Sequence, residues 1–146
     1  MRPARPEDLD AIEAIENKVF DGDRLSRRSL RHFLTAKTAI LLALDAGGRI
    51  AGYSLVGFRK GSFRARLYSI ALDPADHGRG FGRQLLHSSE RAAKARGAMT
   101  MRLEVRTDNS RAIRLYQQNG YFRFAIIDDY YEDGGSALRL EKVLRA

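Results

Sequence analysis

The sequence contains no cysteine. This absence excludes disulfide bonds, thiolate nucleophiles and cysteine-ligated zinc sites. Histidine is scarce as well: its 3 residues, at positions 32, 77 and 87, are too scattered for the ligand spacing of a metal site. The sequence therefore predicts a protein without a bound metal.

Long hydrophobic runs are also missing. Residues 1–8, MRPARPED, contain no apolar segment of the kind found in signal peptides. The longest apolar run, Ala39–Leu44, is far shorter than the roughly 20 residues that a membrane-spanning helix needs. With 44% hydrophobic and 30% charged residues, the composition is that of an ordinary globular protein. We expect a cytoplasmic chain with no membrane partner.

Acidic residues are outnumbered, because 18 Asp and Glu stand against 26 Lys and Arg, for a net charge of +8. The basic residues are spread along the chain rather than gathered in a tail. Two interpretations stay open: solvated surfaces, or attraction to anions such as a phosphate-rich cofactor or a partner near nucleic acid. Direct nucleic-acid binding is not expected, although a ribosome-associated substrate would suit the charge. Four arginines that flank two expected helix starts fit the cofactor: Arg79, Arg83, Arg111 and Arg114.

No repeat or low-complexity stretch divides the 146 residues, so we expect one domain over residues 1–146. Periodicity and turn residues predict helices starting at Pro6 and after Ser26, and helices over 81–96 and 110–119. Strands are predicted over 38–44, 49–58, 64–72, 99–107, 121–130 and 136–144. The central strand–helix–strand unit implies one parallel pair in a mixed, mostly antiparallel α/β sheet.

Three glycines separate the strand that ends at Leu72 from the helix that starts at Phe81. They stand at positions 78, 80 and 82 of the segment DPADHGRGFGR, residues 73–83. Glycine lets the backbone approach a ligand without a Cβ clash, and the first amides of a helix have no intrahelical partner. The segment is therefore either a phosphate or pyrophosphate site or a plain tight turn.

A second segment, LEVRTDNSRAIRLY (residues 103–116), joins a strand to the next helix. Alternation places Glu104 on the polar side of the strand, and Tyr116 lies two turns into the helix. At strand and helical rise, each lies about 10 Å from the junction. Both can therefore lie at one level of the sheet, on opposite sides of a cleft where two strands part. Asp108 or Asn109 is expected to cap the helix.

These two segments, with residues 70–74 (IALDP), Gly120 and residues 130–134 (YYEDG), resemble the GNAT acyl-CoA N-acyltransferases. Within that family the chain looks most like the ribosomal-protein-alanine N-acetyltransferases, which acetylate protein N-termini. The resemblance implies the GNAT-like mixed sheet with helices on both faces, and acetyl-CoA as co-substrate. It implies backbone contacts to the pantetheine arm from Ile70, Ala71 and Leu72. It implies a pyrophosphate site at Gly78, Arg79, Gly80, Phe81, Gly82 and Arg83.

The resemblance also implies roles for three side chains: cofactor contact by Asn109, a base at Glu104 and an acid at Tyr116. A carboxylate can accept the ammonium proton, directly or through a water, and a phenol can donate to the departing thiolate. Since cysteine is absent, acetyl transfer is expected to proceed by direct attack in a ternary complex. Structural alternatives remain: a surface ion pair of Glu104 with Arg102 or Arg106, core packing for Tyr116, and a simple helix cap for Asn109.

Two departures from the family pattern concern the turn and the acceptor. His77 stands where the family usually has Gln or Arg, and residues 21–26 (DGDRLS) lack the aromatic–Ser pattern of the ribosomal-protein enzymes. The acceptor is therefore left open between a peptide N-terminus and a small amine such as a polyamine, an amino acid or an aminoglycoside. A non-catalytic CoA- or RNA-binding module is a further alternative. Four residues could line an acceptor groove or be ordinary loop residues: Asp128, Asp129, Tyr130 and Tyr131.

Overall fold

The computed structural model describes residues 1–20, 22 and 24–144. Its helices are α1 (Leu9–Val19), α2 (Arg27–Thr35), α3 (Phe81–Ala95) and α4 (Ser110–Gln118), with short 3-10 turns at Pro6–Asp8 and Pro74–Asp76. Its strands are β1 (Arg2–Pro3), β2 (Ala39–Asp45), β3 (Ile50–Phe58), β4 (Arg64–Leu72), β5 (Thr100–Arg106), β6 (Phe122–Ile127) and β7 (Ala137–Val143). The predicted order of elements is therefore confirmed.

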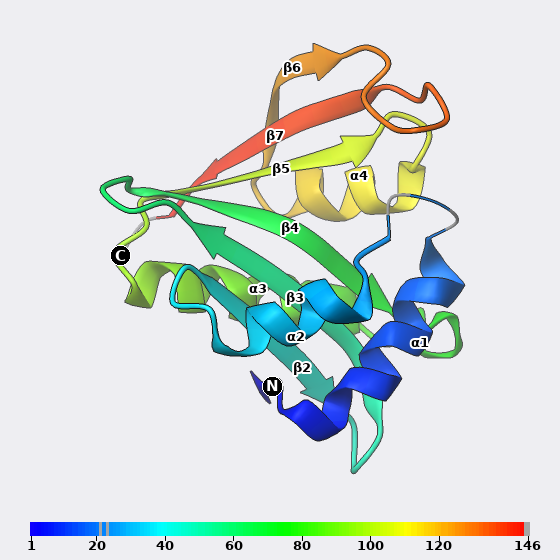
Figure 1. The fold of residues 1–146 in the computed structure, drawn as a ribbon. Coiled ribbons are helices and arrows are strands. Elements are labelled where there is room, and N and C mark those ends of the chain that lie inside the picture. Colours follow the sequence, from blue (N-terminus) through cyan, green and yellow to red (C-terminus); the bar gives the residue numbers. More distant parts are fainter. Residues whose placement is uncertain (21, 23, 145–146) are drawn as a thin grey trace.

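The strands form one seven-stranded sheet in the order β1-β2-β3-β4-β5-β7-β6. Neighbouring strands are antiparallel except β4 and β5, which run parallel and are connected through α3. Helices α1 and α2 lie in front of the sheet in Figure 1, and α3 and α4 lie behind it. This is the predicted fold class, a mixed and mostly antiparallel sheet with helices on both faces.

Hydrophobic clusters pack on both faces of the sheet. In front, Ile12 and Leu30 of α1 and α2 are buried with Tyr53 and Leu55 of β3. Behind, α3 and α4 pack on the inward residues of β4, β5 and β7, with Leu103 among them. The alternation in β5 produces this division, since every second side chain points to the helices.

Helix ends follow the polar residues that the sequence offers. The Ser26 hydroxyl accepts a hydrogen bond from the Ser29 N–H at the start of α2. The Asn109 side chain accepts one from the Ala112 N–H at the start of α4, so Asn109 rather than Asp108 is the cap. Gly120 follows α4 in the left-handed conformation (φ 94°), as expected for a helix C-terminus. Of the predicted break at residues 21–23, positions 21 and 23 lie outside the described residues.

Most strand boundaries lie within one residue of the prediction, and two differences are informative. The strand predicted over 99–107 begins only at Thr100, and Met99 before it is 60% exposed, because the alternating pattern continues past the covered part of the sheet. The predicted strand over 121–130 is shorter, since β6 ends at Ile127 and Asp129 turns the chain with a φ of 53°. Both errors arise where hydrophobic periodicity runs beyond the packed element.

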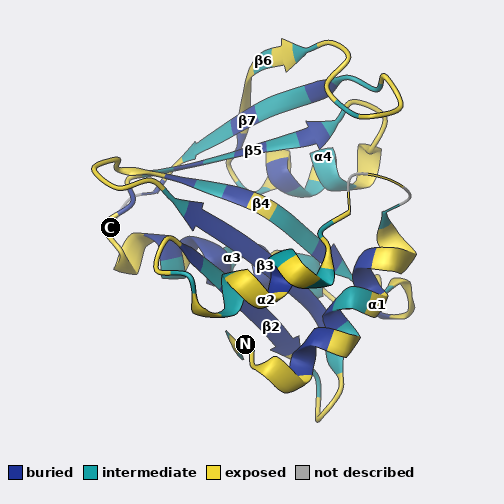
Figure 2. Cartoon of the chain, viewed as in Figure 1, coloured by how far each residue is buried: buried dark blue, intermediate teal, exposed yellow. Residues whose placement is uncertain are grey.

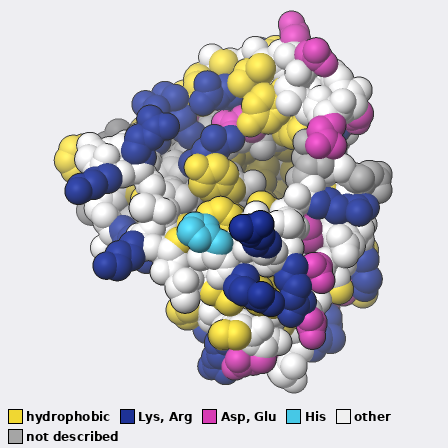
Figure 3. All heavy atoms as spheres, viewed as in Figure 1, with side chains coloured by type: hydrophobic (Ala, Val, Ile, Leu, Met, Phe, Trp, Pro, Cys, Tyr) yellow, Lys and Arg dark blue, Asp and Glu magenta, His cyan; other side chains and the backbone are white. Residues whose placement is uncertain are grey.

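No helix covers the front of β5, β7 and β6 (Figure 2). We call this surface, with the adjoining end of β4, the open face. Basic and hydrophobic side chains gather on it above α2 (Figure 3). Its side chains, assigned by register and contacts, are Arg66, Tyr68, Arg102, Glu104, Phe124, Arg139 and Glu141. Among the described residues, no helix has both the length and the apolar character needed to cross a bilayer.

Candidate functional site

Strands β4 and β5 part after three residue pairs. The parallel ladder joins Arg64 to Thr100 and ends at Arg66 and Arg102, although both strands continue beyond this point. A bulge in β4 lies at the point of separation: Leu55 of β3 pairs with Ser69 and the next residue pairs with Leu67, which leaves Tyr68 as the extra residue. Because a bulge bends its strand, it directs the end of β4 away from β5.

Glycine at position 57 makes this bulge possible. A Cβ there would lie 2.1 Å from the ring of Tyr68, which is far closer than nonbonded atoms approach. The Tyr68 ring therefore lies over Gly57 on β3. The gap between β4 and β5 is built by this glycine–tyrosine contact as well as by the bulge.

The far end of β4 has one strand neighbour. Ile70, Ala71 and Leu72 pair with β3, while their other edge faces the gap. An unpaired strand edge offers alternating N–H and C=O groups, so a peptide-like chain laid in the gap can hydrogen-bond to it. This is the stretch to which the family resemblance assigns the pantetheine arm.

The Gly-rich turn follows at the end of β4. Gly78 and Gly80 have φ angles of 81° and 78°, and a Cβ on either would meet nothing within 4 Å. The first backbone hydrogen bond of α3 runs from the Gln84 N–H to the Gly80 carbonyl. The amides of residues 81–83 come before it and therefore have no partner within the helix. Free amides, a positive helix end and open space above two left-handed glycines suit an anion. The residues present therefore fit the phosphates of a CoA-type ligand.

A buried carboxylate anchors this turn. Asp76 is 1% exposed and accepts hydrogen bonds from both outer nitrogens of Arg49, at 2.8 and 2.6 Å. Arg79 adds a third bond at 3.2 Å and stacks on the ring of Phe81. The bonds from Arg49 are the main reason why the pKa of Asp76 is lowered. Arg79 is thus engaged with the turn itself, whereas Arg83 is exposed at the helix start.

The turn is also fixed to the rest of the gap through Gly82. A Cβ at this position would lie 3.5 Å from the Leu115 side chain of α4 and 3.6 Å from that of Leu72. The start of α3 therefore packs close to α4 and to the end of β4. Asn109, at the start of α4, is exposed and acts as the helix cap described above.

Tyr116 lies on the helix side of the gap. It is buried in the rear cluster together with Leu67 and Leu103, which follow the last β4–β5 pair. Its ring packs edge-to-face on Tyr121 at a centroid distance of 5.7 Å. Burial, and then the Tyr131 phenol, raise the pKa of Tyr116, so the hydroxyl keeps its proton at neutral pH. The core packing considered for Tyr116 is therefore present.

Glu104 lies on the other side of the sheet, on the open face. Its side chain is 6% exposed and forms ion pairs with Arg66 across the gap and with Arg139 of β7. The alternative interpretation of the sequence paired Glu104 with Arg102 or Arg106, but these arginines pair with Glu141 and Asp133 instead. Cross-strand neighbours lie closer than residues two apart on one strand, and Arg139 stands directly opposite Glu104.

The loop between β6 and β7 closes over this cluster. The Tyr130 hydroxyl accepts a hydrogen bond from Arg66 at 3.1 Å and donates to Glu104 at 3.5 Å. Tyr131 packs edge-to-face on Tyr130 and lies under the Arg106 guanidinium. The α1–α2 loop meets the same loop, since a Cβ on Gly22 would lie 3.6 Å from the Glu132 carboxylate. Asp128 and Asp129, by contrast, are exposed.

Three members of this arrangement were missed or left undecided by sequence reasoning: Arg66, Arg139 and Tyr130. The alternation of β7, with Leu138 and Leu140 inward, could have placed Arg139 on the face of Glu104. Tyr130 was weighed as a groove residue without a partner. Its contact with Arg66 and Glu104 depends on how the loop folds back, which no local pattern indicates.

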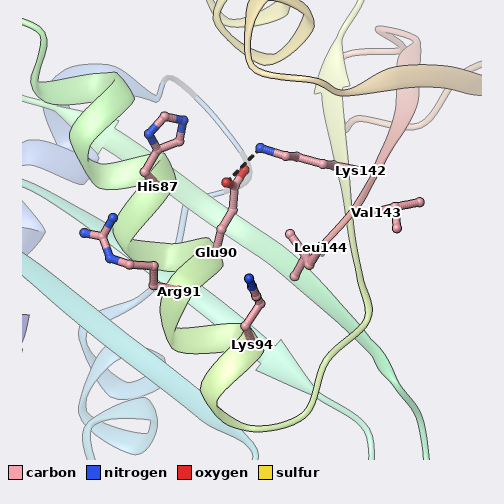
Figure 4. A pocket seen from close by; sticks show the side chains of 7 residues that line it. All are labelled: His87, Glu90, Arg91, Lys94, Lys142, Val143 and Leu144. Atoms are coloured by element: carbon pink, nitrogen blue, oxygen red, sulfur yellow. Dashed lines mark hydrogen bonds and ion pairs between the residues drawn. The ribbon is translucent and has the colours of Figure 1, made fainter. Parts of the chain in front are cut away.

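A separate pocket of about 300 Å³ lies between the C-terminal half of α3 and the end of β7 (Figure 4). On its wall, Glu90 accepts hydrogen bonds from Lys142 at 2.9 Å and from the Tyr121 hydroxyl at 2.8 Å. Burial, and then the Glu90 carboxylate, raise the pKa of Tyr121. This network joins α3 to β7 and is distant along α3 from the Gly-rich turn. We give it a structural role.

Comparison with known proteins agrees with this geometry. The acetyltransferase (GNAT) family model matches residues 8–121. The chain is 39% identical over 93 residues to N-alpha-acetyltransferase RimI of Mycobacterium tuberculosis, covering 62% of this chain and 57% of that protein. It is 37% identical over 90 residues to [ribosomal protein bS18]-alanine N-acetyltransferase of Salmonella typhimurium, covering 62% and 60%. With a further relative from Mycobacterium leprae included, the chain spans between 36% and 60% of the relatives' length.

Among solved structures, the ribosomal-protein-S18-alanine N-acetyltransferase from Escherichia coli superposes with a TM-score of 0.86 at 26% identity, over 99% of this chain and 92% of that one. The parted strands, the Gly-rich turn and the family match over most of the sequence lead to one conclusion. The chain belongs to the acetyltransferase (GNAT) family.

Proposed function

We propose that this protein is an acetyl-CoA-dependent N-acetyltransferase whose acceptor is the N-terminal α-amine of a protein or peptide. The observation that supports this most is the gap between β4 and β5, which runs from the Gly-rich turn to Glu104. Relatives named N-alpha-acetyltransferase and [ribosomal protein bS18]-alanine N-acetyltransferase support the same acceptor class.

The chain's own residues suggest how the donor would be held. Amides of residues 78–83 would bind the pyrophosphate, and the free edge of Ile70–Leu72 would hydrogen-bond the pantetheine arm. Asn109 would contact the ligand from the start of α4. When bound, acetyl-CoA supplies a thioester whose carbonyl an amine can attack. The gap leads this carbonyl toward the open face, where an acceptor can reach it.

Glu104 and Tyr116 are the proposed proton-transfer groups. Glu104 Oε2 lies 3.5 Å from Arg139 Nε in an ion pair but makes no hydrogen bond within the described structure, so it retains the capacity to accept one from the acceptor amine or from a water. Tyr116, on the helix side, keeps its proton and can donate to the departing sulfur. The two groups lie on opposite faces where the strands part, an arrangement compatible with direct attack in a ternary complex.

A peptide fits the acceptor site better than a small polyamine. A small cationic acceptor calls for a closed, acidic pocket, but Glu104 is bracketed by two arginines. No helix of the described residues covers the open face, so an extended chain can lie along it (Figure 2). The acceptor would lie on this face and present its amine to Glu104.

The test is thiol release from acetyl-CoA with N-terminal peptides beside polyamines, amino acids and aminoglycosides. Turnover of peptides that depends on the first residue is the expected result. Turnover of small amines alone would retain acetyl transfer and reject the peptide acceptor. Binding of acetyl-CoA by calorimetry without turnover on any acceptor would contradict the proposed reaction.

A further inference from the structure

The charge balance around Glu104 is unusual for a site that receives an ammonium group. Arg66 and Arg139 both pair with this one carboxylate, which leaves the cluster one positive charge in excess. An acceptor amine in its ammonium form would add a further positive charge at the same place. Like charges at such short range oppose binding unless the acceptor brings a negative charge with it.

The neighbouring arginines of β5 have carboxylate partners of their own. Arg102 has its own carboxylate, with Nε donating to Glu141 at 2.8 Å. Arg106 likewise donates to Asp133 at 2.5 Å and lies near Asp108. Arg102 and Arg106 of β5 are therefore compensated, whereas Arg66 and Arg139 share a single carboxylate and would present uncompensated charge to a ligand anion entering here.

The same cluster contains buried polar atoms without hydrogen bonds. Among the described residues these atoms are the Nε of Arg66, the Nε of Arg139, the Oε2 of Glu104 and one oxygen of Glu16. Three of the four thus belong to a single ion cluster. Buried polar atoms are normally hydrogen-bonded, and exceptions gather where a ligand completes the network.

Both guanidinium groups are held by aromatic rings. Arg66 lies 4.7 Å above the ring of Tyr68, and Arg139 lies 5.3 Å from that of Phe124. Their outer ends are still accessible, since the two side chains are 43% and 36% exposed. Stacked guanidinium groups lose little entropy when they bind a planar carboxylate, which they can grip with two hydrogen bonds.

We propose that the acceptor site selects peptides whose first residue is Asp or Glu, with Arg139 and Arg66 binding the side-chain carboxylate while Glu104 receives the amine. This inference rests on the proposed function and names its substrate class. Glu104 Oε2 and Arg139 Nε lie 3.5 Å apart, and an acidic first residue carries its carboxylate within a few ångströms of its own amine. A carboxylate on the second residue of an extended chain would point to the opposite side.

The experiment compares peptides that begin with Asp, Asn, Glu, Gln or Lys and are otherwise identical, together with one that carries Asp at the second position. Acetyl-CoA is saturating, and kcat/KM is measured by thiol release. We expect Asp to exceed Asn, and Glu to exceed Gln, by at least about tenfold, the discrimination that a charge-assisted hydrogen bond supplies. Equal values within each pair would overturn the inference and leave the proposed function intact.

Variants identify the residues responsible. Arg139→Gln should reduce the Asp-to-Asn ratio to near one, and Arg139→Lys should retain part of it. Arg102→Gln is the matched control, because Arg102 stacks on the same Phe124 at 4.3 Å but pairs with Glu141. A ratio within one enzyme cancels a general loss of folding or activity, so an unchanged ratio in Arg139→Gln counts against the assignment.

Two further outcomes separate this inference from its alternatives. Thiol release from no peptide at all would contradict the proposed function and this inference together. An RNA oligonucleotide that binds the wild type, competes with the Asp peptide and fails to bind Arg139→Gln would assign the open face to nucleic acid and overturn the peptide selectivity. We expect no such competition.

Discussion

Tyr116 packs in the core and is also the proposed proton donor, and one substitution can separate these two roles. It packs in the rear core against Tyr121, and its buried hydroxyl has a raised pKa. Replacing Tyr116 with Phe keeps the ring and removes the donor. We expect kcat to fall about 10²-fold with acetyl-CoA affinity nearly unchanged, because general acid catalysis typically contributes at least that much. The measurement is single-turnover thiol release beside calorimetric binding.

Tyr121→Phe is the matched control for this change. Tyr121 lies in the same cluster, but its hydroxyl donates to Glu90 on the far side from the gap. Its removal should lower the melting temperature, since a buried carboxylate loses a partner, and leave kcat within a few-fold. Equal kcat values in the wild type and Tyr116→Phe would remove Tyr116 from the chemistry and leave it a packing residue.

Individual contacts were harder to predict than individual residues. The motif around Glu104 and Tyr116 placed them on a strand and on a helix, as the structure has them. Glu104's partners come from β4 and β7, the neighbours of β5 in a sheet whose register depends on every strand. Local spacing suggested arginines on Glu104's own strand as its alternative partners, whereas the arginines that pair with Glu104 lie on the neighbouring strands. The pairing of charges is set by tertiary register, which one segment does not encode.

At the scale of elements, the Gly-rich turn owes its shape to backbone conformation. Gly80 has a φ of 78° and open space where a Cβ would point. Replacing it with Val should cost about 1–3 kcal/mol of folding stability, because a β-branched residue is strained in this conformation. It should also weaken acetyl-CoA binding more than tenfold, since the Cβ enters the space proposed for the phosphates. Calorimetric titration measures the second effect.

Gly47→Val separates strain from ligand binding. Gly47 also has a left-handed φ, 72°, and nothing within 4 Å of a Cβ, but it lies in the β2–β3 hairpin. This variant should lose comparable stability and bind acetyl-CoA as the wild type does. Equal loss of binding in both variants would show that strain alone explains the effect and would reject the turn as the phosphate site.

The loop after α1 depends on a buried carboxylate. Glu16 is 1% exposed and accepts a hydrogen bond from the Leu25 N–H at 2.7 Å, and burial raises its pKa. A raised pKa means that the protonated form is favoured by folding, so the wild type loses stability as pH rises past the ordinary glutamate value. Glu16→Gln keeps the acceptor oxygen without the charge. Its melting temperature relative to wild type should therefore increase from pH 4 to pH 8, and a constant difference would contradict this account.

Helices and strands were predictable where the hydrophobic pattern agreed with the capping and turn residues. Ser26 and Asn109 cap the helices that the sequence assigns to them, and β4 begins and ends at the predicted residues. The bulge at Tyr68 was not anticipated, because its cause is the lack of a side chain at Gly57 on a neighbouring strand. The parting of two strands beside Glu104 was expected from the sequence, whereas the bulge that accompanies it has no local signal.

At the scale of the whole molecule, the parted strands divide the sheet into two halves. Strands β1 to β4 form one half and β5, β7 and β6 the other, and three β4–β5 residue pairs join their backbones. Behind the sheet, α3 and α4 share one hydrophobic cluster that bridges the halves. A ligand in the gap would add contacts to both halves, so it should stabilise the fold as a whole as well as fill a site.

Acetyl-CoA should therefore raise the melting temperature measurably. At a concentration of 100 times Kd, binding to the folded state alone adds about 2.7 kcal/mol to the free energy of unfolding. For a chain of this size, this corresponds to a rise of about 5–10 °C. Hydrogen exchange should locate the effect: amides of residues 69–72, on the free edge of β4, should slow more than those of the β2–β3 hairpin at 45–50. Slowing confined to the hairpin, or an equal thermal shift in Gly80→Val, would mean that the ligand binds outside the gap.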